Sequence, residues 1–381
     1  MKRLAVALLA LILVWGMLPL EAKALELDVA GKGAVLMDIA TGTVLYEKNA
    51  HQRLSPASVT KVMTMLLIME AIDDGRIGWD DPVTASEAAA AKGGSQIYLK
   101  VGETMTVREL LKSVAVSSAN DAACALAEHI AGSESAFVSM MNQRAAELGM
   151  NDTNFVNCTG LDDAEEAKDH LTSAYDIAIM SRQLLKYHPE ITKFTTIWMD
   201  TVRDGAFGLS NTNKLVRFYN GCTGLKTGYT SGAGFCLSAS AERDGLGLIA
   251  VVLGCDTSQD RFSACKSMLD YGFANYALVT PEAPEGTVSV TLGTAEGVTA
   301  VPGEESALLV EKAQRDRVTV TVELEPAVAA PVSKGQRLGT MTVRSGEQIL
   351  TRIPMVAADA VPRLTFKELF MEVLRRIAMA K

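Results

Sequence analysis

Residues 58–72 read SVTKVMTMLLIMEAI, an almost continuously apolar run. A helix with this sequence has no polar face, so we expect it in the interior of a domain. Ser58 and Lys61 stand three positions apart, which places both side chains on one face of a helix. Burial disfavours a charged ammonium group and lowers the pKa of the amine. The segment therefore predicts a hydroxyl beside an unprotonated lysine at the start of a core helix.

This pair has an obvious chemical use. A serine hydroxyl is a weak nucleophile until a neighbouring base takes its proton, and Lys61 can be that base. Free backbone N–H groups at the start of the helix suit an oxyanion. The spacing alone is a weak signal, because it recurs at Ser263 and Lys266 in QDRFSACKSMLDYGF. We interpret that second pair as the exposed side of an amphipathic helix, and a structural role stays open for the first pair taken alone.

Two further motifs make a catalytic interpretation more specific. VSSANDAA places Ser118 and Asn120 in a short loop between two helical patterns. GLKTGYTSGAG places Lys226, Thr227 and Gly228 on a strand, where the glycine allows a ligand backbone to approach closely. Singly, these motifs also fit a helix-joining turn and an edge strand. The order serine–x–x–lysine, serine–x–asparagine, lysine–threonine–glycine is typical of penicillin-binding proteins and related β-lactamases.

The region around these motifs, residues 25–278, mixes helical and strand patterns. AVLMDIATGTVLYEKN predicts two strands around Thr41 and Gly42, and TVREL predicts a helix start with a capping box of Thr106 and Glu109. Residues 221–255 read as strands broken by glycines. An α/β or α+β domain with an antiparallel sheet follows.

A second domain is expected at residues 279–360. VTPEAPEGTVSV carries prolines and a glycine typical of a linker, and RVTVTVELEP then alternates with period two, which predicts a half-buried strand. LGTMTV and ILTRIPMV repeat the theme, so we expect a small all-β, sandwich-like domain.

The two ends of the chain suggest attachment to a membrane. Residues 1–24 have a basic start, an apolar run and a small-residue end, which predicts a secretory signal peptide; an uncleaved anchor is the alternative. Residues 361–381 form an amphipathic helix with one apolar stripe: Phe366, Leu369, Phe370, Val373, Ile377 and Ala380. Such a helix can lie in a membrane interface or dock on the β domain.

Composition excludes several other functions. The 381 residues carry a net charge of −9 with no basic stripe, which argues against nucleic-acid binding. Six cysteines without a CxxC pair indicate neither a zinc site nor a dense disulfide framework, and we expect no metal or cofactor. Cys222 and Cys236 flank a predicted hairpin, where a disulfide and free thiols are both open.

The three motifs, together with NFVNCTGLDD, HLTSAYDIA and NTNKLV, make the chain resemble the low-molecular-mass penicillin-binding proteins, which are D-alanyl-D-alanine carboxypeptidases of the serine peptidase S11 type. The sequence most resembles those of the enzymes of spore-forming Gram-positive bacteria, including the sporulation-associated type. The resemblance implies a transpeptidase domain with helices on both sides of an antiparallel sheet, a small β domain and an amphipathic tail. It also implies an exported protein attached to the outer face of the cytoplasmic membrane.

The resemblance assigns roles to the first two motifs. Ser58 attacks the carbonyl between the two terminal D-alanines of a peptidoglycan stem peptide, and Lys61 is the general base. Ser118 relays protons to the leaving amine, and Asn120 holds the substrate amide. β-Lactam antibiotics are implied as covalent inhibitors, and no cofactor is implied.

The third motif is implied to recognise the end of the substrate. Lys226 and Thr227 bind the terminal carboxylate, and backbone N–H groups of Ser58 and Tyr229, the residue after Gly228, form the oxyanion hole. A second cation at Lys226 would further disfavour charge on Lys61. Some relatives carry an arginine in an NRN stretch where this chain has threonine, in Asn211-Thr212-Asn213, which leaves open whether Lys214 or Arg217 helps bind the carboxylate.

Three other functions stay open at this level. A β-lactamase needs a carboxylate that activates water, and GLDDAEEAKDH offers Glu165 and Glu166, although the segment reads as a solvated acidic loop. An inactive peptidoglycan-binding protein would keep the fold without the reaction. Endopeptidase side activity uses the same chemistry.

Overall fold

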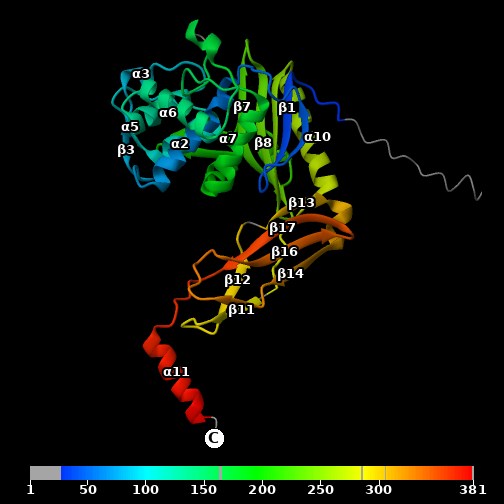
Figure 1. Ribbon diagram of the computed structural model, residues 1–381. Coiled ribbons are helices and arrows are strands. Elements are labelled where there is room, and N and C mark those ends of the chain that lie inside the picture. Colours follow the sequence, from blue (N-terminus) through cyan, green and yellow to red (C-terminus); the bar gives the residue numbers. More distant parts are fainter. Residues whose placement is uncertain (1–26, 163–164, 285, 305, 380–381) are drawn as a thin grey trace, which may run out of the picture.

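The computed structural model describes residues 27–162, 165–284, 286–304 and 306–379. A helix-rich domain built around a five-stranded sheet is followed by a β domain and a final helix, which lies at the end remote from the first domain (Figure 1). The expected signal peptide lies outside the described residues. This arrangement is the fold class that the motifs predicted.

The sheet of the first domain has five antiparallel strands in the order β2-β1-β9-β8-β7. Its strands are β1 Gly33–Asp38, β2 Val44–Lys48, β7 Cys222–Thr230, β8 Gly234–Arg243 and β9 Leu246–Cys255. The glycine-broken run at 221–255 forms β7, β8 and β9, and the turn at Thr41 and Gly42 joins β1 to β2, as predicted.

Both faces of this sheet are covered. In β1, Val35 and Met37 pack into one buried cluster, while Ala34 and Leu36 pack into another. Helix α7 (Ala174–Tyr187) packs on the first face, and α10 (Ser258–Asn275) packs on the second. Because successive side chains of a strand point to opposite faces, two apolar layers require the near-continuous hydrophobic runs seen in β1 and β9.

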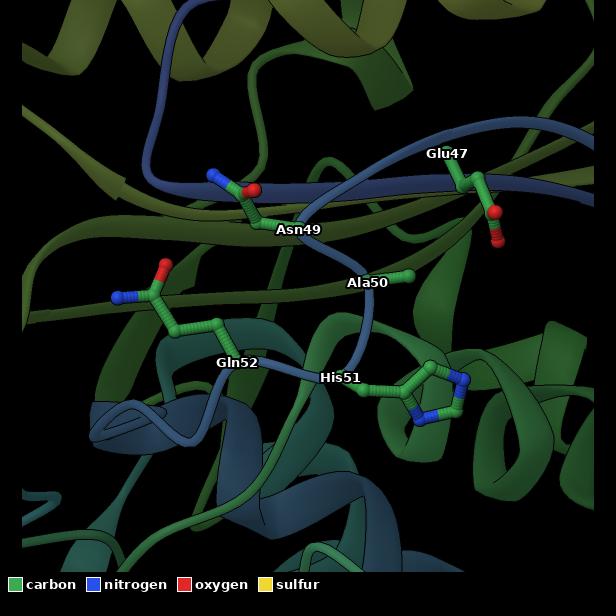
Figure 2. Close-up of a pocket in the computed structure, with 5 residues that line it drawn as sticks. All are labelled: Glu47, Asn49, Ala50, His51 and Gln52. Carbon is green, nitrogen blue, oxygen red and sulfur yellow. The ribbon is translucent and has the colours of Figure 1, made fainter.

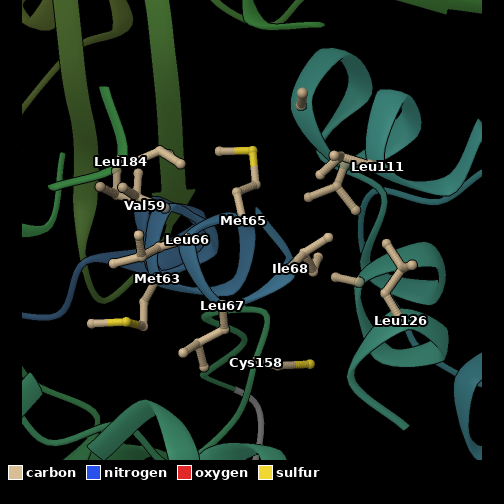
Figure 3. Close-up of a cluster of buried hydrophobic side chains, with 14 of the residues drawn as sticks. Val59, Met63, Met65, Leu66, Leu67, Ile68, Leu111, Leu126, Cys158 and Leu184 are labelled. Carbon is tan, nitrogen blue, oxygen red and sulfur yellow. The ribbon is translucent and has the colours of Figure 1, made fainter. Parts of the chain in front are cut away.

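The central helix is α2, Lys61–Asp73, which is preceded by a 3₁₀ turn, η1, at Ala57–Thr60. The sequence had suggested that the α-helix begins at Ser58, but it begins at Lys61. Its side chains are buried all round, between Leu184 of α7 on one side and Leu111 and Leu126 on the other (Figure 3).

Helices α4 (Val107–Ser117), α5 (Asn120–Ala131) and α6 (Glu134–Glu147) complete the layer around α2. The predicted capping box is confirmed, because Thr106 Oγ1 accepts the Glu109 N–H and Glu109 accepts the Thr106 N–H. The remaining elements are short: α3 Glu87–Ala90, α8 Thr192–Thr195, α9 Leu215–Phe218, η2 Glu165–Asp169, η3 Pro189–Ile191, β3 Pro82–Thr84 paired with β4 Thr104–Thr106, and β5 Met199–Val202 paired with β6 Phe207–Ser210.

The β domain contains a six-stranded sheet in the order β14-β16-β17-β12-β11-β15. Its strands are β11 Gly286–Thr291, β12 Gly297–Pro302, β14 Val318–Leu324, β15 Ala327–Ala329, β16 Arg337–Ser345 and β17 Gln348–Ala357. The alternation predicted for β14 is present, with half-buried apolar residues between exposed polar ones. Strand β10 (Tyr276–Val279) pairs with β13 (Leu308–Glu311), ahead of the 3₁₀ turn η4 (Lys312–Arg317), so a division of the chain at 278/279 falls within a strand.

The tail forms α11, Phe366–Met379. Phe366, Phe370, Val373 and Ile377 are all exposed along it. Among the described residues, no helix combines the length and apolar character needed to cross a bilayer.

The cysteines are free thiols. A Cys222–Cys236 disulfide is contradicted by the register of the hairpin, where Cys222 lies opposite Ala241 and Cys236 lies opposite Gly228. The two residues therefore stand at different levels of the β7–β8 pair, beyond the reach of a disulfide.

Candidate active site

The nucleophile candidate sits on a strained turn. Ala57, immediately before Ser58, has a φ of 48°, in the left-handed region that a residue with a Cβ seldom adopts. Ser58 follows in η1, and Lys61 is the first residue of α2. Lys61 Nζ lies 2.9 Å from Ser58 Oγ and donates a hydrogen bond of 2.7 Å to the Thr159 carbonyl. The predicted pair is therefore in hydrogen-bond contact.

Lys61 is fully buried. Burial lowers the pKa of its amine from 10.5 to about 7, while the carboxylate of Asp121 acts in the opposite direction. A substantial fraction of the amine is thus unprotonated near neutral pH. That form has a lone pair that can accept the proton of Ser58.

The second motif lies between two helices. Ser118 has a φ of 65° and ends α4, and Asn120 begins α5. Asn120 Nδ2 donates to the Gly93 carbonyl at 2.7 Å. Ser118 Oγ and Asn120 Oδ1 are buried, yet neither has a hydrogen-bond partner among the described residues. Since buried polar atoms are normally paired, these two are free to accept a hydrogen bond from a ligand.

Asp121, next in sequence, was not predicted from the sequence as a functional residue. Its buried carboxylate accepts backbone N–H groups of Ile97 (3.2 Å) and Leu99 (2.9 Å), which ties the 93–99 loop to α5. It also influences the pKa of Lys61. Its position beside the asparagine of the SAN motif was the available signal.

The third motif lies on β7, directly against the nucleophile turn. A Cβ built on Gly228 would lie 2.6 Å from the Pro56 carbonyl oxygen and 3.1 Å from the Ser58 nitrogen, so only glycine allows this approach. Thr227 Oγ1 donates to Thr212 Oγ1 at 2.6 Å, and the Thr212 N–H donates to the Val116 carbonyl at the end of α4. These contacts connect β7 both to Ser58 and to the helix that precedes Ser118.

Lys226 is fully buried, and its Nζ donates to the Thr227 carbonyl at 2.9 Å. Burial lowers its pKa well below the usual value, and the positive charges of Lys61 and Arg261 lower it further. The sequence had suggested that Lys226 would depress the pKa of Lys61. Burial is the main cause of the lowered pKa at both amines, and the charge of Lys61 lowers the pKa of Lys226 further.

Tyr229 follows Gly228, and its exposed ring stacks on Phe235 with a centroid separation of 4.3 Å. The role predicted for Tyr229 is that of its backbone N–H. The carbonyl of the preceding Gly228 accepts a hydrogen bond of 2.9 Å from the guanidinium of Arg261, a residue of α10. Arg261 lies far from the motifs in sequence, and nothing in its local sequence indicated this contact.

The alternative residues are placed elsewhere. Ser263 and Lys266 are exposed on α10, where Lys266 pairs with Asp270, so this second serine–x–x–lysine is not a site, as interpreted from the sequence. Glu165 is exposed and ion-paired with Lys168. It is therefore not held in the way that a water-activating carboxylate requires.

Two other features carry no site. A surface hollow of about 540 Å³ is lined by residues 47 and 49–52, but the amides of Asn49 and Gln52 point away from the His51 ring (Figure 2). In the described part of the chain, Cys124, Glu134 and Cys158 could offer three metal-ligand atoms within 4.8 Å of one another. Glu134 is already ion-paired with Lys92 at 2.5 Å, and a hydrogen bond with Cys124, together with burial, holds the pKa of the Cys158 thiol high.

Known proteins share this architecture. A family profile described as D-alanyl-D-alanine carboxypeptidase matches residues 20–257, and one described as penicillin-binding protein 5, C-terminal domain, matches residues 273–363. The chain is 44% identical over 348 residues to D-alanyl-D-alanine carboxypeptidase DacF of Bacillus subtilis (strain 168), which covers 90% of this chain and 88% of the relative.

Solved structures agree with the sequence comparison. The chain is similar to penicillin-binding protein 5 from Haemophilus influenzae, with a TM-score of 0.76 and 31% identity, over 88% of this chain and 98% of the other. It is also similar to penicillin-binding protein D2 from Listeria monocytogenes in the ampicillin-bound form, with a TM-score of 0.57 and 33% identity, over 65% of this chain and 99% of the other. In sequence and in fold, the chain belongs to the D-alanyl-D-alanine carboxypeptidase family of low-molecular-mass penicillin-binding proteins.

Proposed function

We propose that this chain is a serine-type carboxypeptidase in which Ser58 is the nucleophile and Lys61 the general base. The supporting observation is the 2.9 Å contact between Lys61 Nζ and Ser58 Oγ, made by a fully buried lysine. A base in this position lies within the distance that proton transfer requires. The substrate is a peptidoglycan stem peptide that ends in D-Ala-D-Ala, in keeping with the family.

The reaction has two stages, acylation of Ser58 and hydrolysis of the resulting ester. Lys61 takes the proton of Ser58 Oγ as the oxygen bonds to the carbonyl carbon between the two D-alanines. The C–N bond then breaks, and the proton passes from Lys61, with Ser118 as relay, to the departing amine of D-alanine. Water next attacks the ester, Lys61 accepts its proton, and Ser58 recovers a proton as the shortened peptide leaves.

The two walls of the site hold the substrate. Asn120 Oδ1 accepts a substrate amide N–H, and backbone N–H groups of Ser58 and Tyr229 donate to the developing oxyanion. The terminal carboxylate lies against Lys226 and the hydroxyl of Thr227. Thr212 contacts that hydroxyl and extends this carboxylate subsite where some relatives carry an arginine.

We further propose that β-lactams acylate Ser58. Intact-protein and peptide mass spectrometry after exposure to penicillin tests this, together with D-alanine release from a D-Ala-D-Ala peptide. One adduct is expected, on the peptide that contains Ser58, and Ser58→Ala should lose both the adduct and the release. An adduct on Ser263 would refute the assignment, and rapid turnover of penicillin would favour a β-lactamase instead.

Export and membrane attachment are part of the proposal. The exposed apolar stripe of α11 supports a helix that lies on the outer face of the cytoplasmic membrane, with its apolar side in the interface. The β domain between α11 and the catalytic domain then separates the active site from the lipid surface (Figure 1).

A further inference from the structure

The carbonyl oxygen of Ala57 is held by a chain of buried side chains that the proposed reaction does not use. Thr60 Oγ1 donates to this oxygen at 2.8 Å and lies 2.8 Å from His170 Nε2. On the other side of the ring, the Val156 N–H donates to His170 Nδ1 at 3.0 Å. Since Nδ1 is an acceptor, a neutral ring carries its proton on Nε2 and donates to Thr60.

The ring is neutral under ordinary conditions. Burial lowers the pKa of His170 to about 4, and the neighbouring Lys61 acts in the same direction. Thr60 and His170 are both almost fully buried, so water does not compete for these hydrogen bonds. The hydrogen bonds are therefore all donated in one direction, from Val156 through His170 and Thr60 to Ala57.

The hydrogen bond to the Ala57 carbonyl also affects the Ser58 N–H, through the geometry of the peptide bond. The carbonyl of Ala57 and the N–H of Ser58 belong to one planar trans peptide unit, and they point in opposite directions. Fixing the Ala57 oxygen therefore fixes the direction of the Ser58 N–H. Ala57 needs such support, because its φ of 48° is unfavourable for alanine.

Packing leaves this peptide unit little freedom. A Cβ built on Gly160 would lie 1.8 Å from the Ala57 oxygen, so Gly160 lies directly against this carbonyl, close to Thr60. The peptide unit that carries the Tyr229 N–H has a comparable support, because Arg261 donates to its Gly228 carbonyl.

We propose that Thr60 and His170 are positioning residues of the oxyanion hole, which aim the Ser58 N–H by holding the Ala57 carbonyl on the opposite side of the same peptide unit. This inference rests on the proposed function, since it assumes acylation at Ser58. Neither side chain touches the substrate, so their effect falls on the acylation step and not on binding of the ligand.

Two pairs of variants test the proposal in the full chain, by stopped-flow acylation with a fluorescent penicillin. Thr60→Val removes the hydroxyl and keeps the shape, whereas Thr60→Ser keeps the hydroxyl. His170→Asn places its amide near the Nδ1 position and loses the donor to Thr60, whereas His170→Gln extends its amide nitrogen to the Nε2 position. Thr195→Val is the matched control, because it removes another buried hydroxyl, which donates to the Thr223 carbonyl.

The expected result separates rate from affinity. The limiting acylation rate should fall about 10- to 100-fold in Thr60→Val and His170→Asn, with the dissociation constant for penicillin unchanged, because an oxyanion donor is misdirected. Thr60→Ser, His170→Gln and Thr195→Val should stay within about threefold to fivefold of the parent. The pH midpoint of acylation should not move, because Lys61 keeps its environment.

Equal rates in Thr60→Val and Thr60→Ser would overturn the positioning role, as would a loss accompanied by a shifted pH midpoint, which would place the effect on Lys61. The Thr60 pair decides if a His170 variant fails to fold. A parent chain that penicillin does not label would refute the proposed function itself, whereas a labelled parent with indistinguishable Thr60 variants refutes only this inference.

Discussion

Lys61 Nζ lies 2.9 Å from Ser58 Oγ, at the junction of a 3₁₀ turn and the central helix of the domain. The same nitrogen donates to the Thr159 carbonyl, and no part of its side chain reaches solvent. The fold thus places an amine where it is poorly solvated and beside the hydroxyl that it would deprotonate in the proposed reaction. Stability and reactivity at this position are consequently opposed.

We predict that Lys61→Met raises the stability of the folded chain, relative to the parent, more at pH 7 than at pH 10. The unfolded chain binds this proton below about pH 10.5 and the folded chain only below about pH 7, so the parent loses stability as the pH falls from 10.5 to 7. The loss is on the order of 5 kcal/mol, and the methionine variant lacks it. Urea unfolding of both proteins at pH 7 and pH 10 measures the difference, and a pH-independent difference would contradict the prediction.

Binding of a carboxylate ligand should protonate Lys226. Its pKa is held well below the usual value by burial and by neighbouring cations, and a substrate carboxylate would reverse that shift. Calorimetry of Ser58→Ala with a D-Ala-D-Ala peptide at pH 8, in two buffers with different ionisation enthalpies, should show uptake of up to about one proton. At that pH Lys61 is largely neutral already. Equal uptake by a variant that also carries Lys226→Met would place the proton elsewhere.

Gly228→Ala should slow acylation. The new Cβ would meet the Pro56 oxygen at 2.6 Å and force β7 away from the nucleophile turn. A displacement of this kind can cost about 100-fold in rate. Gly208→Ala is the matched control, because this strand glycine has open space around its Cβ position and should acylate at the parent rate. Similar rates for the two variants would show that the close approach does not matter.

Removal of α11 should abolish membrane binding without affecting catalysis. A chain that ends at residue 364 should fail to sediment with anionic phospholipid vesicles, because the exposed apolar stripe is lost. A full-length chain that carries Phe366→Glu and Phe370→Glu should fail for the same reason. D-alanine release should be unchanged in both. Vesicle binding by the truncated chain would mean that another segment makes the attachment.

The sequence was most informative where the chemistry is local. Ser58 and Lys61 are one turn apart, and Ser118 and Asn120 are separated by one residue, so the order of the motifs along the chain was enough to single out each pair. The near-continuous apolar run of α2 likewise predicted a buried helix.

Long-range contacts were not accessible in this way. His170 contacts Thr60, and Arg261 donates to the Gly228 carbonyl. Both partners are remote in sequence, and neither His170 nor Arg261 carries a local pattern that indicates its partner. At the 3₁₀ turn before α2, Ala57 has a positive φ and its carbonyl approaches Gly160 closely, and helix propensity expresses neither feature. The choice between a Cys222–Cys236 disulfide and free thiols stayed open, because hairpin register cannot be deduced from the positions of two cysteines.

The most direct test of the account is the rate at which penicillin acylates Ser58 in the parent and in Lys61→Met between pH 5 and pH 9. The parent rate should rise with pH to a plateau with a midpoint near 7, as Lys61 loses its proton. The variant should be about 100- to 10,000-fold slower and should lack that midpoint, because its general base is absent. Acylation of Lys61→Met at the parent rate would contradict the assignment of Lys61 as the base.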